Sequence, residues 1–317
     1  DHRDLHLSIR RQRQMCIRDR YNALDVNQQE KSSKTAIFWE GENRESRIIT
    51  YGELYTQVKK FANVLKSLGV KRGERITIYL PMVPELVIVM LACARIGVIH
   101  TVVFSGFSAI SLKDRVEDSG SKIIVTADGG FRKGKLIKLK EIVDESASNV
   151  NSVEHVIILR RANNKINLNA KDLFWSDLMN TSSEDCEAEK LDSTHPLYIL
   201  YTSGTTGKPK GVLHGTGGYL THLYSTFKWA FDIKHDDVYF CTADIGWVTG
   251  HSYVAYGPLL HGATQVMYEG APDYPNASRM WDIIQKYNVT IFYTTPTALR
   301  MFMKFGDDIP NSFNLSS

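Results

Sequence analysis

Apolar positions in the first third of the chain follow a helical period. Between Leu54 and Leu65, apolar residues recur every three or four positions, which predicts an amphipathic helix. Thr50 and Glu53 have the spacing of a capping box, and Gly69 is a typical helix stop. The pattern therefore predicts a helix between this cap and this glycine.

Strand and helix patterns then alternate. Short apolar runs predict strands, and helical periods with Pro84 or Gly97 at their ends predict helices. In order, the expected elements are a strand at 75–80, a helix at 84–96, a strand at 98–104, a helix at 108–120 and a strand at 122–127. This order predicts an α/β fold with mostly parallel sheets flanked by helices. The most apolar run, 83–104, contains Glu85, Arg95 and His100, so it predicts a buried helix and strand instead of a membrane span.

The second half resumes the alternation after a polar segment. Residues 144–195 are irregular, with one strand candidate at 155–160, and we expect them to link two halves. Further strands are predicted at 197–202, 237–243, 264–270 and 290–295, with a helix at 219–231 and another starting at Pro296. The chain ends in a polar string without a stop to the fold, so we expect the sheet to be incomplete at the C-terminus.

Composition excludes several partner classes. The chain has 317 residues, of which 43% are hydrophobic and 23% charged, as in soluble globular proteins. The net charge of +3 belongs to residues 1–20, which hold six Arg and three Asp, so the remainder is neutral. We therefore expect neither nucleic acid nor a membrane as partner of the folded body. No sequence feature indicates an oligomeric state.

Residues 1–20 differ from the rest of the chain. They lack apolar periodicity and the pattern of a secretory signal. The run "RRQRQMCIRDR" resembles a translated sequencing adapter, so we interpret 1–20 as a non-native extension. The alternative is a basic targeting or nucleic-acid-binding arm.

Cysteine spacing favours a reduced cytoplasmic protein without structural zinc. Cys16, Cys93, Cys186 and Cys241 are widely separated, and no Cys/His pair has metal-ligand spacing. Without a secretory signal, the reducing cytosol is the expected compartment.

The stretch "YTSGTTGKPKGVLHGTGG", residues 201–218, has the composition of a phosphate-binding loop. Glycines allow backbone N–H groups to approach an anion, while hydroxyls and lysines add donors and charge. It is not the P-loop of NTPases, because only two residues separate Gly204 from Gly207 and Pro209 follows Lys208. The loop would therefore wrap an oligophosphate without a strand-to-helix turn. A polar surface turn is the alternative, and the residues alone leave both open.

Three stretches carry a family resemblance. "YTSGTTGKPKGVLH" resembles the phosphate-binding signature of the adenylate-forming superfamily. "TADIGWVTGHSYVAYGPLLHGAT" and "VTADGGFRKGK" resemble the AMP-forming acetyl-coenzyme A synthetases, and the likeness runs from about Tyr21 to Ser317. It implies that 21–317 form part of the large N-terminal domain of the adenylate-forming fold, and that the small C-terminal domain with its catalytic lysine is absent.

The resemblance implies an acetate–CoA ligase. Acetate would attack the α-phosphate of ATP to give acetyl-AMP and pyrophosphate, and the CoA thiol would then displace AMP. Substrates and cofactors would be ATP/AMP, CoA and Mg²⁺, with the magnesium ligands mostly beyond this chain. The alternatives are a ligase for propionate or another short-chain acid and, for the isolated chain, a non-catalytic domain that binds nucleotide or CoA.

The resemblance also implies site residues, and it implies no protein-bound metal among them. Phosphate-binding residues would be Thr202, Ser203, Gly204, Thr205, Thr206, Gly207, Lys208 and Lys210, with Lys208 as the catalytic residue. CoA-binding residues would be Arg132, Lys133, Gly134, Lys135, Thr249 and Asp273, and the acyl pocket would be Trp247, Val248 and Thr249.

Each of these assignments has a structural alternative. The cationic stretch 132–135 reads as a flexible, solvated loop, and Trp247 as a core aromatic. Asp273 is unfavourable beside an anionic ligand unless its carboxylate meets a hydroxyl or an amine. For His214 and His251 we favour structural roles, because neither has metal-ligand spacing and the chemistry needs no base.

Overall fold

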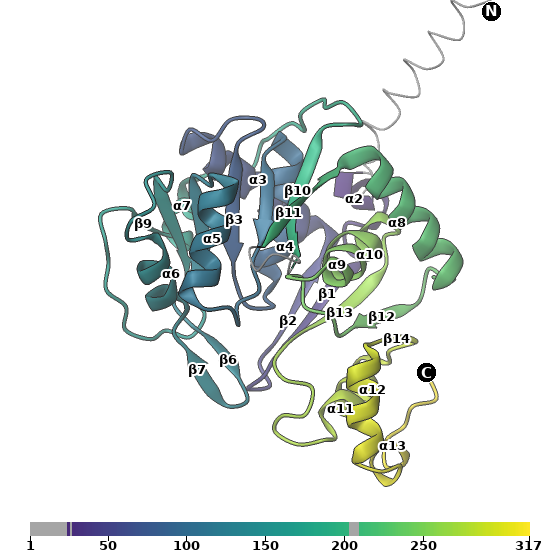
Figure 1. The fold of residues 1–317 in the computed structure, drawn as a ribbon. Helices are drawn as coiled ribbons and strands as arrows, with labels where there is room; N and C mark the ends of the chain where they lie inside the picture. The colour runs from purple at the N-terminus through teal and green to yellow at the C-terminus, as the bar shows by residue number, and fades with distance from the viewer. Residues whose placement is uncertain (1–23, 26, 203–208) are drawn as a thin grey trace, which may run out of the picture.

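The computed structural model describes residues 24–25, 27–202 and 209–317 (Figure 1). The extension at 1–20 and the loop residues 203–208 lie outside the described residues. Two open sheets and a small hairpin make up the β-structure of the described chain. Helices cover the sheets, so the α/β class predicted from the sequence is confirmed.

The larger sheet has the strand order β11-β10-β4-β3-β5-β8-β9. All neighbours are parallel except β10 and β11, which form an antiparallel pair. Its strands are β3 (Arg75–Tyr79), β4 (Ile99–Val102), β5 (Ile123–Ala127), β8 (His155–Leu159), β9 (Asp172–Phe174), β10 (Pro196–Thr202) and β11 (Lys210–Gly215).

The smaller sheet has the order β14-β12-β13-β1-β2, again parallel except at the β1–β2 pair. Its strands are β1 (Thr35–Gly41), β2 (Ser46–Thr50), β12 (Val238–Cys241), β13 (Thr264–Glu269) and β14 (Ile291–Tyr293). A separate antiparallel hairpin, β6 (Gly130–Arg132) and β7 (Lys135–Ile137), projects below the larger sheet in Figure 1.

The helices begin and end largely where caps and glycines predict. Thr50 and Glu53 form both hydrogen bonds of the capping box, and Gly97 and Gly120 take left-handed conformations at helix ends. The helices are α2 (Asn27–Lys31), α3 (Tyr51–Ser67), α4 (Pro84–Ile96), α5 (Ala109–Ser119), α6 (Leu139–Ala147), α7 (Trp175–Thr181), α8 (Thr216–Ala230), α9 (Val248–Gly250), the π-helix η2 (His251–Tyr256), α10 (Gly257–Leu260), α11 (Arg279–Tyr287), α12 (Pro296–Lys304) and α13 (Asp308–Asn311).

The predicted linker at 144–195 is wrong, because the sheets interleave the two halves of the sequence. Strands β8 and β9 extend the larger sheet, and β10 returns to pair with β4 in the same sheet. Conversely, β1 from the start of the chain pairs with β13, with Ile37 opposite Gln265. One continuous apolar core joins the sheets through α3 and α4, and α4 is buried along its whole length.

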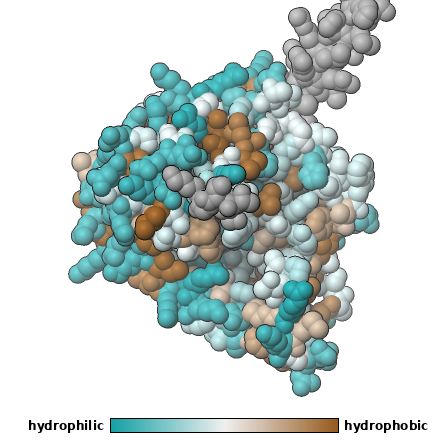
Figure 2. Space-filling model, viewed as in Figure 1, coloured by the Kyte–Doolittle hydropathy of each residue, from teal (hydrophilic) through white to brown (hydrophobic). Residues whose placement is uncertain are grey.

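The exposed surface carries scattered apolar residues. On the face in Figure 2, hydrophobic side chains lie in small patches among hydrophilic ones. None of the described helices is both long and apolar enough to cross a bilayer.

Candidate functional site

A cleft of about 550 Å³ lies where strands of both sheets end. Its walls come from the segments that follow β3, β4, β12 and β13 at their carboxyl ends. Ligands of open parallel sheets bind at this edge, because the loops that leave the strands converge there. The lining includes Arg132, Trp247, Val248 and Thr249, so the cleft brings together candidates for the CoA and acyl sites.

Trp247 forms part of the cleft wall and is not a core aromatic. Its side chain is 54% exposed, and its ring lies 6.4 Å from that of Phe104 and 6.2 Å from that of Phe107, between centroids. Trp247 precedes α9, and Gly250 of α9 packs against the backbone of Asp244. A Cβ atom added at Gly250 would lie 2.1 Å from the Asp244 carbonyl oxygen. A side chain at position 250 would therefore push α9 away from the backbone of Asp244.

The cationic stretch 132–135 is an ordered hairpin and not the flexible loop expected from the residues alone. Arg132 lies opposite Lys135 across the two strands, and Lys133 and Gly134 make the turn at φ values of 52° and 72°. The Arg132 guanidinium carbon lies 5.7 Å from the Phe104 ring centroid. Two cations in a directly opposed pair repel each other, and an anion bound between them would relieve that repulsion.

Asp273 meets an amine, as its placement near an anion site requires. Its Oδ2 lies 2.8 Å from Nζ of Lys133, in a salt bridge between the hairpin and the segment after β13. Among the described residues no carboxylate lies within ion-pair distance of Lys135. The cations left for a ligand are therefore Arg132 and Lys135.

The predicted phosphate loop is only partly described. Thr202 ends β10 and pairs with Lys210 at the start of β11, and both are exposed. The loop therefore joins two antiparallel strands, and α8 begins only at Thr216, which confirms that the strand-to-helix geometry of an NTPase P-loop is absent here. Ser203, Gly204, Thr205, Thr206, Gly207 and Lys208 lie outside the described residues.

His214 stacks on the buried Tyr198, and His251 packs against the same ring at a tilt of 35°. The ring centroid of Tyr198 lies 4.4 Å from that of His214 and 4.5 Å from that of His251. Burial lowers the pKa of both imidazoles, that of His251 to about 4. Both rings are therefore neutral near pH 7, and these observations support packing roles.

Asp244 in the cleft wall and Glu42 at the hairpin turn were not singled out from the sequence. Asp244 lines the cleft and accepts a hydrogen bond from the Gly246 N–H at 2.7 Å. Burial raises the pKa of Asp244 to about 6, although the nearby Arg132 charge acts in the opposite direction. Glu42 follows β1 and holds the turn of the hairpin through its backbone. A charged residue directly after a strand is the one signal that could have identified Glu42.

No three His, Cys, Asp or Glu side chains in the described ranges gather as metal ligands. Because Mg²⁺ is often held by one or two carboxylates with water and substrate phosphates, the expected use of magnesium stays a prediction.

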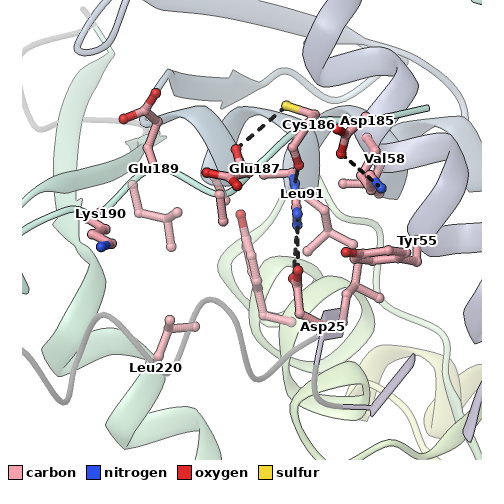
Figure 3. Close-up of a pocket in the computed structure, with 17 residues that line it drawn as sticks. Asp25, Tyr55, Val58, Leu91, Asp185, Cys186, Glu187, Glu189, Lys190 and Leu220 are labelled. Carbon is pink, nitrogen blue, oxygen red and sulfur yellow. Dashed lines mark hydrogen bonds and ion pairs between the residues drawn. The ribbon is translucent and has the colours of Figure 1, made fainter. Parts of the chain in front are cut away.

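A second cavity of about 470 Å³ has a different character (Figure 3). Its buried cation, Arg95, donates to both carboxylate oxygens of Asp25 at 2.9 and 3.0 Å and to the Cys186 carbonyl at 2.8 Å. Among the described residues, the two cavities share no lining side chain. Because Arg95 is already neutralised, the first cleft is the better candidate for an anionic ligand.

Comparison with known proteins identifies relatives of this chain. The chain is 54% identical over 299 residues to the acetyl-coenzyme A synthetase of Chlorobaculum tepidum, which covers 94% of this chain and 45% of that protein. It is 55% identical over 300 residues to the acetyl-coenzyme A synthetase of Rubrobacter xylanophilus, which covers 94% of this chain and 47% of that protein. The chain thus spans about half the length of the curated relatives it matches.

A solved structure and a family model extend the comparison. The acetoacetyl-CoA synthetase from Streptomyces lividans matches with a TM-score of 0.85 at 28% identity, covering 94% of this chain and 45% of that one. The model of the AMP-binding enzyme family matches residues 24–316. Because that match includes both sheets, the hairpin and the cleft, the chain belongs to the AMP-binding enzyme family.

Proposed function

We propose that the chain is the greater part of the large N-terminal domain of an acetate–CoA ligase that acts through acetyl-adenylate. The single observation that carries the proposal is the cleft, which places the Trp247 wall and the Arg132 hairpin on one cavity at the carboxyl ends of both sheets. Identity of 54–55% to two acetyl-coenzyme A synthetases favours acetate over the acetoacetate named for the 28% identical structure.

In the first step, a carboxylate oxygen of acetate attacks the α-phosphorus of ATP. A new P–O bond forms as the bond to the β-phosphate breaks, and pyrophosphate leaves. We assign the phosphates to the loop from Thr202 to Lys210, with Lys208 opposite the charge that develops on the leaving group. Trp247, Val248 and Thr249 would wall the methyl group of acetate, since a small acid needs a short apolar pocket.

In the second step, the CoA thiol loses its proton and attacks the acyl carbon. A C–S bond forms, the C–O bond to AMP breaks, and AMP leaves. Arg132 and Lys135 would hold the phosphorylated adenosine end of CoA, and Thr249 would contact CoA from the cleft wall. We assign Lys133 and Asp273 to the shape of the hairpin, because each neutralises the charge of the other in a salt bridge.

A cytoplasmic location and small-molecule partners belong to the same proposal. The described cysteines, Cys93, Cys186 and Cys241, are all buried free thiols, as expected in a reducing compartment. Outside residues 1–20 the chain is neutral, which supports ATP, acetate and CoA as partners and gives no basis for nucleic acid.

Hydroxamate trapping of the adenylate tests the proposal. The full-length protein that carries residues 21–317 is incubated with ATP and acetate, propionate or butyrate, and kcat/KM is compared. We expect acetate to have the highest value. A clear preference for propionate or butyrate would assign the protein to longer acids, and failure to adenylate any of the three would remove the ligase assignment.

A further inference from the structure

Glu42 joins the two segments that carry the candidate CoA residues. One carboxylate oxygen, Oε1, accepts hydrogen bonds from the Lys133 N–H at 2.8 Å and the Ala271 N–H at 2.9 Å. The other, Oε2, accepts one from the Gly134 N–H at 2.9 Å. Glu42 follows β1 of the smaller sheet, whereas the hairpin follows β5 of the larger sheet. A single side chain therefore connects the hairpin turn to the segment of Asp273.

The Glu42 side chain is a buried charge that backbone groups compensate. Glu42 is 2% exposed, and no lysine or arginine of the described chain lies within ion-pair distance of it. Three N–H donors replace the lost hydration, and hydrogen bonds to a charged acceptor are about twice as strong as neutral ones. Glu42 therefore adds order to a turn whose own strands have only three residues each.

The hydrogen bonds of Glu42 determine which donors and charges of the hairpin can still bind a ligand. Two successive N–H groups in a tight turn form a concavity that binds anions. Here the Glu42 carboxylate fills that concavity, so the backbone N–H groups of Lys133 and Gly134 are already used. A phosphate would have to be bound by the side chains of Arg132 and Lys135, which the turn holds opposite each other.

We propose that Glu42 is a positioning residue for the CoA step: it holds the hairpin turn so that Arg132 and Lys135 flank one anionic group of CoA. This proposal rests on the proposed function. Glu42 itself does not contact the ligand. Adenylation uses the phosphate loop and the acyl wall, neither of which hydrogen bonds to Glu42 within the described residues. Loss of the Glu42 carboxylate should therefore affect the second step and spare the first.

The variant Glu42→Gln isolates this role because it keeps the shape of the side chain. Its amide oxygen can accept hydrogen bonds from two of the three N–H donors. Its NH₂ group then lies against the third N–H, and two donors cannot form a hydrogen bond with each other. The control is Glu40→Gln, two residues earlier on β1. Glu40 is also buried, but its carboxylate binds Arg279, Lys286 and Tyr287 on α11 instead of the hairpin.

The experiment measures both half-reactions in the full-length protein. For Glu42→Gln we expect KM for CoA to rise roughly tenfold, the effect of losing one charged hydrogen bond. We expect acetate-dependent pyrophosphate exchange to stay near wild type, and Glu40→Gln to lower stability without changing the ratio of the two steps. An equal loss in both steps for Glu42→Gln, or an unchanged KM for CoA, would overturn the positioning role.

A second measurement does not depend on a folded variant. In wild-type protein, amide hydrogen exchange at Lys133 and Gly134 should be slow although both residues are exposed, because Glu42 holds both N–H groups. Exchange as fast as in an unstructured peptide would overturn the proposal. If the wild type shows this protection but no pyrophosphate exchange with any acid, the proposed ligase function fails while the anchoring of the hairpin by Glu42 stands.

Discussion

At the scale of single residues, Lys133 and Asp273 show how a carboxylate can lie in a site for an anion. The Lys133 side chain is 59% exposed, yet its charge is balanced by Asp273 at 2.8 Å. Exposed ion pairs contribute little stability, so the main effect of this one is on the local potential. Arg132 and Lys135 carry the net positive charge of the hairpin.

Asp273→Asn should therefore strengthen CoA binding, because it releases the charge of Lys133. We expect KM for CoA to fall roughly two- to fivefold at low ionic strength and the gain to fade as salt screens the site. Steady-state kinetics at two salt concentrations measure this. As a matched pair, Lys133→Gln should raise KM for CoA less than Arg132→Gln does. An increase in KM for Asp273→Asn would indicate that Asp273 itself contacts CoA.

Acid stability depends on the buried His251 and the partly buried Asp244, which have opposite effects. The pKa of His251 is lowered by burial from 6.5 to about 4, so between these values the unfolded chain binds a proton that the folded protein does not. Stability is therefore lost as pH falls through this window, by about 3 kcal/mol in total for this group. The pKa of Asp244 is raised from 3.8 to about 6, so Asp244 adds stability as pH falls through that range.

Substitutions of His251 and Asp244 should change the pH dependence of stability in opposite directions. His251→Gln should flatten the fall of the thermal midpoint between pH 6.5 and 4, whereas Asp244→Asn should steepen it. Burial also lowers the pKa values of His214 and His261. These two residues should therefore still make stability fall with pH in both variants. Parallel pH profiles for wild type and both variants would contradict these assignments.

At the scale of elements, strong local signals predicted the structure well. The capping box at Thr50 and the left-handed Gly97 each mark a helix end in the sequence and in the structure. The buried strands of the larger sheet were equally clear, because both of their faces are apolar. Wherever a cap or a continuous apolar run exists, local sequence was sufficient.

Elements held by distant contacts could not be predicted this way. The β6–β7 hairpin has three-residue strands and a charged turn, and Glu42 stabilises it from 91 residues away. The β1–β2 pair and the interleaving of the sheets also depend on partners far along the chain. For the same reason the role of Glu42, whose one local signal is its position directly after β1, is not predicted from the sequence.

The hairpin turn yields a prediction at this scale. At Gly134, with φ of 72°, an added Cβ would lie 2.3 Å from the Tyr274 hydroxyl oxygen, whereas at Gly69, with φ of 77°, it would meet no atom within 4 Å. Backbone strain of about 1–2 kcal/mol is common to alanine at both positions. Gly134→Ala should also displace the hairpin and raise KM for CoA, whereas Gly69→Ala should lower only the thermal midpoint. Equal effects of both variants on KM would contradict the steric argument.

At the scale of the whole molecule, the cleft exists only when both ends of the described chain have folded. Strand β1 pairs with β13, β10 pairs with β4, and the walls of the cleft come from both sheets. Trp247 and the hairpin at Arg132 are 115 positions apart in sequence but line the same cavity. The proposed function needs this proximity, because the adenylate formed in its first step is attacked in its second.

In the proposed function, one cleft serves two separable steps, and the hairpin is needed only for CoA. The ratio of acetyl-CoA formation to acetate-dependent pyrophosphate exchange in full-length protein carrying Arg132→Ala tests this separation. We expect this ratio, measured at CoA below KM, to fall roughly tenfold or more from the wild-type value, the effect of losing a charged contact to CoA, while exchange is retained. An unchanged ratio, with both rates normal or both reduced equally, would contradict the assignment of the hairpin to CoA.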